Sequence, residues 1–117
     1  MHRKIISSFG HAIRGIRAAW VDGWNFRIQI VAGIALGIFI VYFHFSYLES
    51  VPIVIAATFV LFGELVNTAV EGLLDVVEPE HHPTVGKIKD MVAGAVLIAS
   101  IGAVIIGVLT FVHHFLI

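Results

Sequence analysis

The fold of this chain is decided by residues 52–77, which read PIVIAATFVLFGELVNTAVEGLLDVV. The stretch exceeds the ~20 mostly apolar residues that a helix needs to cross a bilayer. It nevertheless contains Glu64 and Glu71, with Asn67 between them. A carboxylate at membrane depth costs roughly 2.5–3.5 kcal/mol on insertion scales, so such a group usually faces a protein interior or a functional site.

Four polar residues of this stretch share one side of the predicted helix. At 100° per residue, Glu64, Asn67, Glu71 and Asp75 form a stripe from mid-membrane to the helix end. The structural alternative is a polar seam that only fixes helix packing, which an asparagine can do alone. Three acids with no base in the span fit that alternative poorly, because carboxylates repel unless a cation or proton joins them. The stripe therefore favours a functional site.

The composition places this site in a membrane. Hydrophobic residues make up 59% and charged residues 13% of the chain, and the mean hydropathy is +1.00, whereas soluble domains are about 45–50% apolar and about 25% charged. The 117 residues form one domain that is too short to enclose so much apolar surface. The absence of cysteine excludes disulfides and thiol chemistry, and the net charge of -1 gives no reason to expect nucleic acid binding.

We predict an all-α membrane protein with a single domain over residues 1–117. Three spans are expected, at about residues 28–45, 52–77 and 91–116. No signal peptide is expected, because the first apolar stretch begins late and no small-residue cleavage pattern follows it.

Charge distribution predicts the orientation. Glu49 is the charged residue of the short turn near 46–50, and Lys87 and Lys89 lie in the second connection. Five basic residues, opposed only by Asp22, precede the first span: Arg3, Lys4, Arg14, Arg17 and Arg27. By the positive-inside rule the N-terminus and the second connection are cytoplasmic, and the C-terminus is outside.

Residues 2–20 are predicted to form an amphipathic surface helix. Its basic residues lie mostly off an apolar line that recurs every three or four positions, through Ile5, Phe9, Ile13, Ile16 and Trp20. Such a helix suits the headgroup layer of anionic lipid. The pattern leaves open whether it is a generic anchor or contributes directly to catalysis.

Small residues predict close helix packing. Gly33 and Gly37 form a GxxxG motif in the first span. In the third span a small residue recurs every four positions, at Ala95, Ala99, Ala103 and Gly107. Such residues let helix backbones approach closely in lipid. Because three helices provide little interior for a multi-acid site, an oligomer is expected.

The second connection, residues 78–90, reads EPEHHPTVGKIKD. Its prolines and Gly86 predict a turn at the membrane surface. Acids of the stripe would meet phosphate-binding side chains there, namely His81, His82, Lys87 and Lys89. Magnesium prefers a few carboxylates plus substrate phosphates, and lysine is a common partner of phosphate.

Two other interpretations of the histidine pair remain open. His81 and His82 could bind a transition metal, although no further ligand cluster with metal spacing supports that, or they could be ordinary polar loop residues. The chain has no P-loop and no glycine-rich nucleotide motif, so a nucleotide site here would be unorthodox.

Several segments together resemble a known family. They are ELVNTAVE at 64–71, Asp75, the pair His82-Pro83, KDMVAGAVL at 89–97, RGIRAAW at 14–20 and NFR at 25–27. This set resembles the prokaryotic diacylglycerol kinase family, which includes the undecaprenol kinases of Gram-positive bacteria. The resemblance covers nearly the whole chain, and the ExxNxxxE motif paired with Lys-Asp is specific. The His-Pro pair is more similar to the undecaprenol kinase branch.

The resemblance implies a homotrimer of three-span subunits with an added surface helix, in the bacterial inner membrane. Such enzymes transfer the γ-phosphate of ATP, with Mg²⁺, to a lipid hydroxyl at the cytoplasmic membrane surface. The acceptor would be undecaprenol, which is slightly favoured, or diacylglycerol.

The resemblance also implies roles for individual residues. Glu64 matches the family's general base, Asn67 the asparagine of its motif, and Glu71 a metal-binding glutamate that also contacts nucleotide. The remaining nucleotide contacts fall at Glu80, His81, His82, Lys89 and Asp90. Lys4 and His11 match N-terminal nucleotide contacts with altered residue types.

One position departs from the family pattern. The family's second metal-binding glutamate lies three residues before the phenylalanine of the NFR-like segment, and that position is Gly23 here. The adjacent Asp22 could supply a shifted carboxylate, so Glu71 and Asp22 are the expected Mg²⁺ ligands.

Two alternatives to a lipid kinase remain. The loss of a ligand at Gly23 would suit a catalytically impaired homologue that acts as a membrane assembly or regulatory subunit. Intramembrane acids also occur in proton- or cation-conducting oligomers, but residues 53–62, in the outer part of the second span, are nearly all apolar and argue against a conduction path.

Overall fold

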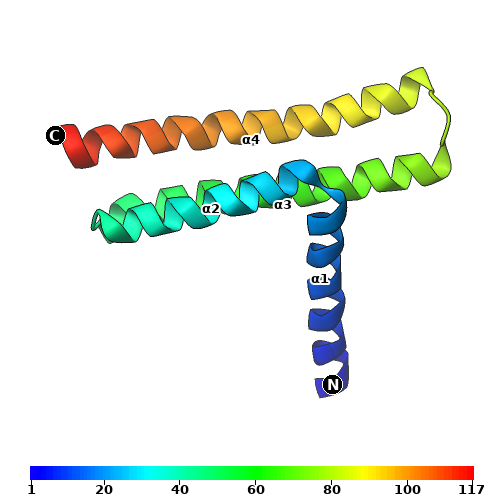
Figure 1. Ribbon diagram of the computed structural model, residues 1–117, viewed down its shortest axis with the longest axis horizontal. Helices are drawn as coiled ribbons and strands as arrows, with labels where there is room; N and C mark the ends of the chain where they lie inside the picture. Colours follow the sequence, from blue (N-terminus) through cyan, green and yellow to red (C-terminus); the bar gives the residue numbers. More distant parts are fainter.

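Four α-helices and no strands make up the computed structural model of this chain, which describes residues 1–117. The helices are α1 (His2–Asp22), α2 (Trp24–Tyr42), α3 (Tyr47–Val77) and α4 (Pro83–Leu116). Figure 1 shows α2, α3 and α4 running alongside one another, with α1 projecting away from them. α3 packs against both α2 and α4. The predicted all-α class is therefore confirmed.

Three of these helices, α2, α3 and α4, are long and apolar enough to cross a membrane. α2 begins at Trp24 and ends at Tyr42, and both α3 and α4 begin before the apolar stretches at 52–77 and 91–116. Apolar stretches mark only the part of a helix that suits lipid, whereas the helix itself follows its backbone hydrogen bonds into flanking polar residues. The chain is thus a multi-pass membrane protein. Its α3 and α4 are each longer than the apolar stretch that they contain.

The interior of a single chain is small. Eight of the 117 residues are buried, and six of these are apolar: Ala19, Phe26, Ile40, Ile53, Val60 and Val96. Large apolar side chains are exposed on all four helices, for example Phe9 at 67%, Ile38 at 66% and Ile98 at 74%. Burying this surface requires lipid or other subunits, because one chain of this size cannot enclose it.

A single extended residue separates α1 from α2. Gly23 has φ -103° and ψ 101°, and its N–H donates to the carbonyl of Ala19 at 2.7 Å. This residue turns the chain sharply, so that α1 leaves the direction of the other helices (Figure 1). Ala19 and Phe26, on either side of the turn, are both 4% exposed, so the junction itself is packed although most of α1 is not.

The turn from α2 to α3 ends in a capping box. The Ser46 hydroxyl accepts from the Glu49 N–H at 3.2 Å, and the Glu49 carboxylate accepts from the Ser46 N–H at 2.9 Å. This reciprocal arrangement satisfies two backbone donors that a helix start would otherwise leave free. The same carboxylate accepts from the end of α4, from His114 Nδ1 at 3.0 Å and His113 Nδ1 at 3.2 Å, and so fastens the start of α3 to the end of α4.

The turn predicted over residues 78–90 is shorter than expected. α4 already begins at Pro83, and Gly86 lies within it. Proline is well tolerated at the first helical position, because the N–H that it lacks would have no partner in the helix. The His82 side chain caps this end by accepting from the Thr84 N–H at 3.2 Å. The pair His82-Pro83 therefore starts a helix here.

Candidate active site

The buried polar side chains of the chain are those of Glu64 and Asn67, which are 6% and 7% exposed. Both lie on α3, on the stripe that the sequence predicted. Glu71 and Asp75, further along the same helix, are exposed. The stripe therefore passes from a buried acid in the middle of α3 to exposed acids near its end.

The asparagine connects the two parts of the stripe. Its Nδ2 donates to Glu71 Oε1 at 3.3 Å, which holds the exposed carboxylate on the side of the helix that carries Glu64. The Asn67 Oδ1 is buried and has no hydrogen-bond partner within the chain. Because buried polar atoms are nearly always paired, this oxygen is available to a donor from a substrate, a water or another subunit.

A polar cavity of about 270 Å³ lies where α3 ends and α4 begins. The ion pair of Lys89 and Asp75, 2.6 Å apart, joins the two helices there. Of the predicted nucleotide contacts, four line this cavity: Glu80, His81, His82 and Lys89. Asp90 follows Lys89 and is exposed, but it does not line the cavity.

Two predicted nucleotide contacts lie elsewhere in a single chain. Lys4 and His11 belong to the part of α1 that projects away from the other helices (Figure 1), and both are exposed. His11 interacts with its own helix, through Arg14 and through Ser7 at 3.4 Å. The structure of one chain therefore does not bring them to the cavity beside Lys89.

The two predicted magnesium ligands lie on different helices. Asp22 is the last residue of α1 and is exposed, while Glu71 lies on α3. No group of three or more His, Cys, Asp or Glu side chains in this chain has a geometry that could hold a metal ion. Mg²⁺ commonly keeps several waters and binds one or two carboxylates plus substrate phosphates, so the donor set fits an ion that arrives with a nucleotide better than a permanently held metal.

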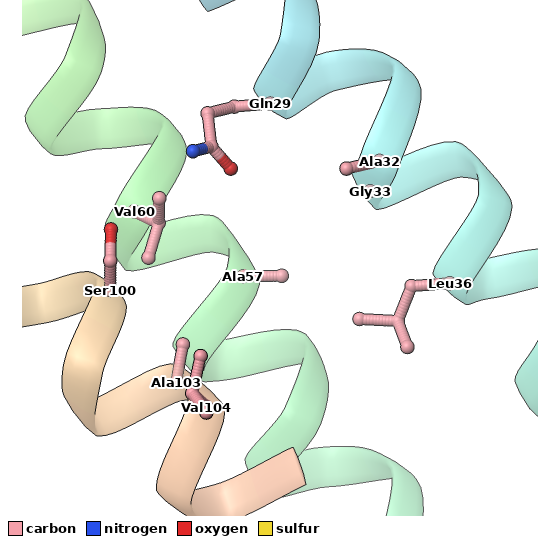
Figure 2. A pocket seen from close by; sticks show the side chains of 9 residues that line it. All are labelled: Gln29, Ala32, Gly33, Leu36, Ala57, Val60, Ser100, Ala103 and Val104. Atoms are coloured by element: carbon pink, nitrogen blue, oxygen red, sulfur yellow. The ribbon is translucent and has the colours of Figure 1, made fainter. Parts of the chain in front are cut away.

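Two residues near the stripe were missed by the sequence analysis. Thr68 lies against Gly23 at the junction of α1 and α2. Gln29 points from α2 toward Val60 of α3 and lines a mostly apolar cavity of about 220 Å³, as Figure 2 shows. Neither had a signal of its own, because a single threonine or glutamine in an apolar helix is unremarkable until its neighbours on other helices are known.

Together, the fold and this stripe define a small multi-pass membrane protein with an acidic site near one end of its helices. The sequence pattern of the family described as prokaryotic diacylglycerol kinase matches residues 10–111. The chain belongs to this family and is a lipid kinase of diacylglycerol kinase or undecaprenol kinase type.

Some relatives of this chain are named diacylglycerol kinases, and another is named an undecaprenol kinase. The diacylglycerol kinase of Escherichia coli (strain K12) is 32% identical over 112 residues, covering 96% of this chain and 92% of that protein. The undecaprenol kinase of Bacillus subtilis (strain 168) is 33% identical over 108 residues, covering 92% and 88%. The diacylglycerol kinase of Synechocystis sp. (strain ATCC 27184 / PCC 6803 / Kazusa) is 34% identical over 105 residues, covering 89% and 60%.

Proposed function

We propose that this protein transfers the γ-phosphate of ATP to the hydroxyl of a membrane lipid, undecaprenol or diacylglycerol, at the cytoplasmic membrane surface. The observation that carries the proposal is the arrangement on α3. A buried acid, Glu64, lies on the same face as the Asn67–Glu71 hydrogen bond of 3.3 Å, and a polar cavity with Lys89 lies at the end of that helix. A lipid hydroxyl reaches the first part from the bilayer, and a nucleotide reaches the second from water.

Phosphoryl transfer depends on alignment and charge neutralisation more than on covalent chemistry. In this proposal Glu64 accepts the proton of the lipid hydroxyl as general base, since it is the acid that lies deepest in the apolar part of α3. Asn67 orients Glu71 through its Nδ2 and offers its free Oδ1 to a donor at the site.

The other predicted residues act on the nucleotide. Glu71 and Asp22 would hold Mg²⁺, which, when bound, neutralises charge on the phosphates. The Lys89 ammonium would leave Asp75 to bind phosphate, and the remaining contacts would be Glu80, His81, His82, Asp90, Lys4 and His11. Because Lys4 and His11 are far from the cavity within one chain, their participation requires α1 of another subunit.

The proposed assembly is a homotrimer in the bacterial inner membrane, with α1 on the cytoplasmic surface as an amphipathic helix. Its apolar residues are free to enter lipid, since Ile5, Phe9 and Ile13 are 49%, 67% and 60% exposed. The basic residues of α1 and those near the start of α4 support a cytoplasmic N-terminus and an external C-terminus. Crosslinking of the protein in native membranes would test the subunit number.

The deciding experiment is a lipid kinase assay with radiolabelled ATP. The purified protein is incubated in mixed micelles with undecaprenol, with diacylglycerol, or with a lipid that has no free hydroxyl. Transfer of label to one alcohol and not to the hydroxyl-free lipid is expected. If no alcohol is labelled while MgATP still binds, the catalytically impaired alternative is supported.

A further inference from the structure

Gly23 and Thr68 approach each other more closely than any side chain at position 23 would allow. A Cβ built on Gly23 would lie 2.9 Å from Thr68 Oγ1, 2.8 Å from the carbonyl oxygen of Ala19 and 3.2 Å from the Cβ of Phe26. Distances under 3.0 Å are essentially never found for a real Cβ. The backbone of Gly23 therefore rests directly on the threonine of α3.

The glycine is required here by space and not by its backbone conformation. Its φ of -103° and ψ of 101° are angles that any residue can adopt. An ordinary helix-ending glycine has a left-handed conformation, which Gly23 lacks. Two close approaches therefore explain the glycine, one to the Ala19 carbonyl at the end of α1 and one to Thr68 of α3.

Thr68 cannot simply turn away from this contact. Its hydroxyl donates to the carbonyl of Glu64 at 3.0 Å, which holds Oγ1 on the side of α3 that faces the junction. The same hydroxyl thus touches Gly23 and the backbone of the buried acid. The contact lies one turn from Glu64 and next to Asn67, the two buried polar residues of the chain.

The junction is also where α1 is attached to the rest of the chain. α1 contacts α2 and α3 but not α4, and its single buried residue is Ala19, four positions before Gly23. A shift at the Gly23–Thr68 contact would therefore move all of α1, including Asp22, relative to the stripe on α3.

We propose that Gly23 and Thr68 form a fitted contact that sets the position of α1 and Asp22 against α3, with Thr68 acting as a positioning residue for the kinase reaction. The reaction part of this inference rests on the function proposed above, while the fitted contact does not. A direct consequence is that a glutamate at position 23 would not restore the family's second metal ligand, because its Cβ has no room. In this chain the side chain at position 68 limits which side chains position 23 can accept.

A double-mutant cycle on the full-length protein tests the contact. The variants are Gly23→Ala, Thr68→Ala and the double variant, and the measurement is thermal unfolding in detergent. Gly23→Ala is expected to lower the melting temperature, and Thr68→Ala is expected to remove much of that effect by vacating the Oγ1 position. Part of the loss should remain, because the Ala19 carbonyl still faces the new Cβ.

Two substitutions without such neighbours serve as controls. Gly15→Ala adds a Cβ in α1 with nothing within 4 Å, and Thr58→Ala removes an exposed threonine hydroxyl from α3. The changes in melting temperature caused by Gly15→Ala and Thr58→Ala are expected to add when the two are combined. Residues in contact typically couple, whereas the effects of independent sites add, so additive effects of Gly23→Ala and Thr68→Ala would overturn the fitted contact.

The positioning role is measured by the magnesium dependence of the kinase rate in the same variants. Gly23→Ala should raise the Mg²⁺ concentration at half-maximal rate by about threefold or more, and Thr68→Ala should reduce that shift in the double variant. Thr68→Ser, which keeps the hydroxyl, should match the parent. An unchanged midpoint in Gly23→Ala would reject the positioning role, even if the unfolding cycle showed coupling. If the parent phosphorylates no lipid, the proposed function fails, and the unfolding cycle still decides the contact.

Discussion

The Nζ of Lys89 lies 2.6 Å from the Oδ1 of Asp75, and this ion pair joins the start of α4 to the end of α3. The side chains are 35% and 66% exposed, and an ion pair in contact with water is typically worth about 0–1 kcal/mol. The pair is therefore weak enough to be exchanged for a phosphate. In the proposed function, Asp75 holds the Lys89 ammonium in place until a nucleotide phosphate takes over the contact.

Lys89→Ala is expected to raise the KM for MgATP by about tenfold while the melting temperature changes little. The reason is that a lysine–phosphate contact is charge-assisted and roughly twice as strong as a neutral hydrogen bond. Lys87→Ala is the matched control, since Lys87 is exposed and does not line the cavity. Steady-state kinetics and thermal unfolding of both variants make the comparison. Equal KM values in the two variants would contradict the assignment of Lys89.

Glu64→Gln is expected to lower kcat by roughly 10²–10⁴-fold, the usual contribution of a positioned acid or base. Glutamine keeps the shape of the side chain and removes its basicity. Glu49→Gln, near the opposite end of α3, serves as the control and should retain kcat. Sedimentation in detergent should show the parent's oligomer for the Glu64 variant. Near-normal turnover by Glu64→Gln would end the general-base proposal.

Glu71→Ala and Asn67→Ala should affect magnesium dependence in the same direction but to different extents. Glu71→Ala removes a proposed ligand, whereas Asn67→Ala only releases the carboxylate that its Nδ2 holds at 3.3 Å. We expect the Mg²⁺ midpoint to rise by about tenfold or more in the first variant and less in the second. A magnesium titration of the kinase rate measures both. A larger effect of Asn67→Ala would indicate that Asn67 contacts the substrate itself.

Asp22→Asn tests whether this acid replaces the missing glutamate. If Asp22 is the second carboxylate, its loss should raise the Mg²⁺ midpoint by a factor comparable to that of Glu71→Ala, because each carboxylate strengthens Mg²⁺ binding. Glu49→Gln, near the other end of α3, removes a carboxylate charge away from the proposed site and is the control. A midpoint equal to the parent's in Asp22→Asn would leave Glu71 as the single metal carboxylate.

The contact between Glu49 and the end of α4 is expected to stabilise the fold without affecting catalysis. The His114 and Glu49 side chains are 18% and 11% exposed, and the His113 side chain is 69% exposed. The His114 ring also stacks on Phe45 at a centroid distance of 4.0 Å. His114→Ala should therefore lower the melting temperature more than His113→Ala. Equal shifts would show that the stacking of the His114 ring on Phe45 and its lower exposure add nothing to its contact with Glu49.

The sequence by itself determined the helices and the acidic face of α3. Both follow from local rules: a helix places residues 64, 67, 71 and 75 on one side whatever surrounds it, and apolar length predicts a membrane helix. The exact start of α4 was harder to predict, because Pro83 is compatible both with a turn and with a first helical position.

Only the tertiary structure decided which distant residues meet. Glu49 and His114 are separated by 65 positions and Lys89 and Asp75 by 14, and no periodicity links either pair. The sequence marks Gly23 only as the position of a missing ligand, and the tertiary structure adds its close contact with Thr68 of α3. Such contacts depend on how whole helices pack against each other, which is set by the combined fit of many side chains and is not written in any one stretch of the chain.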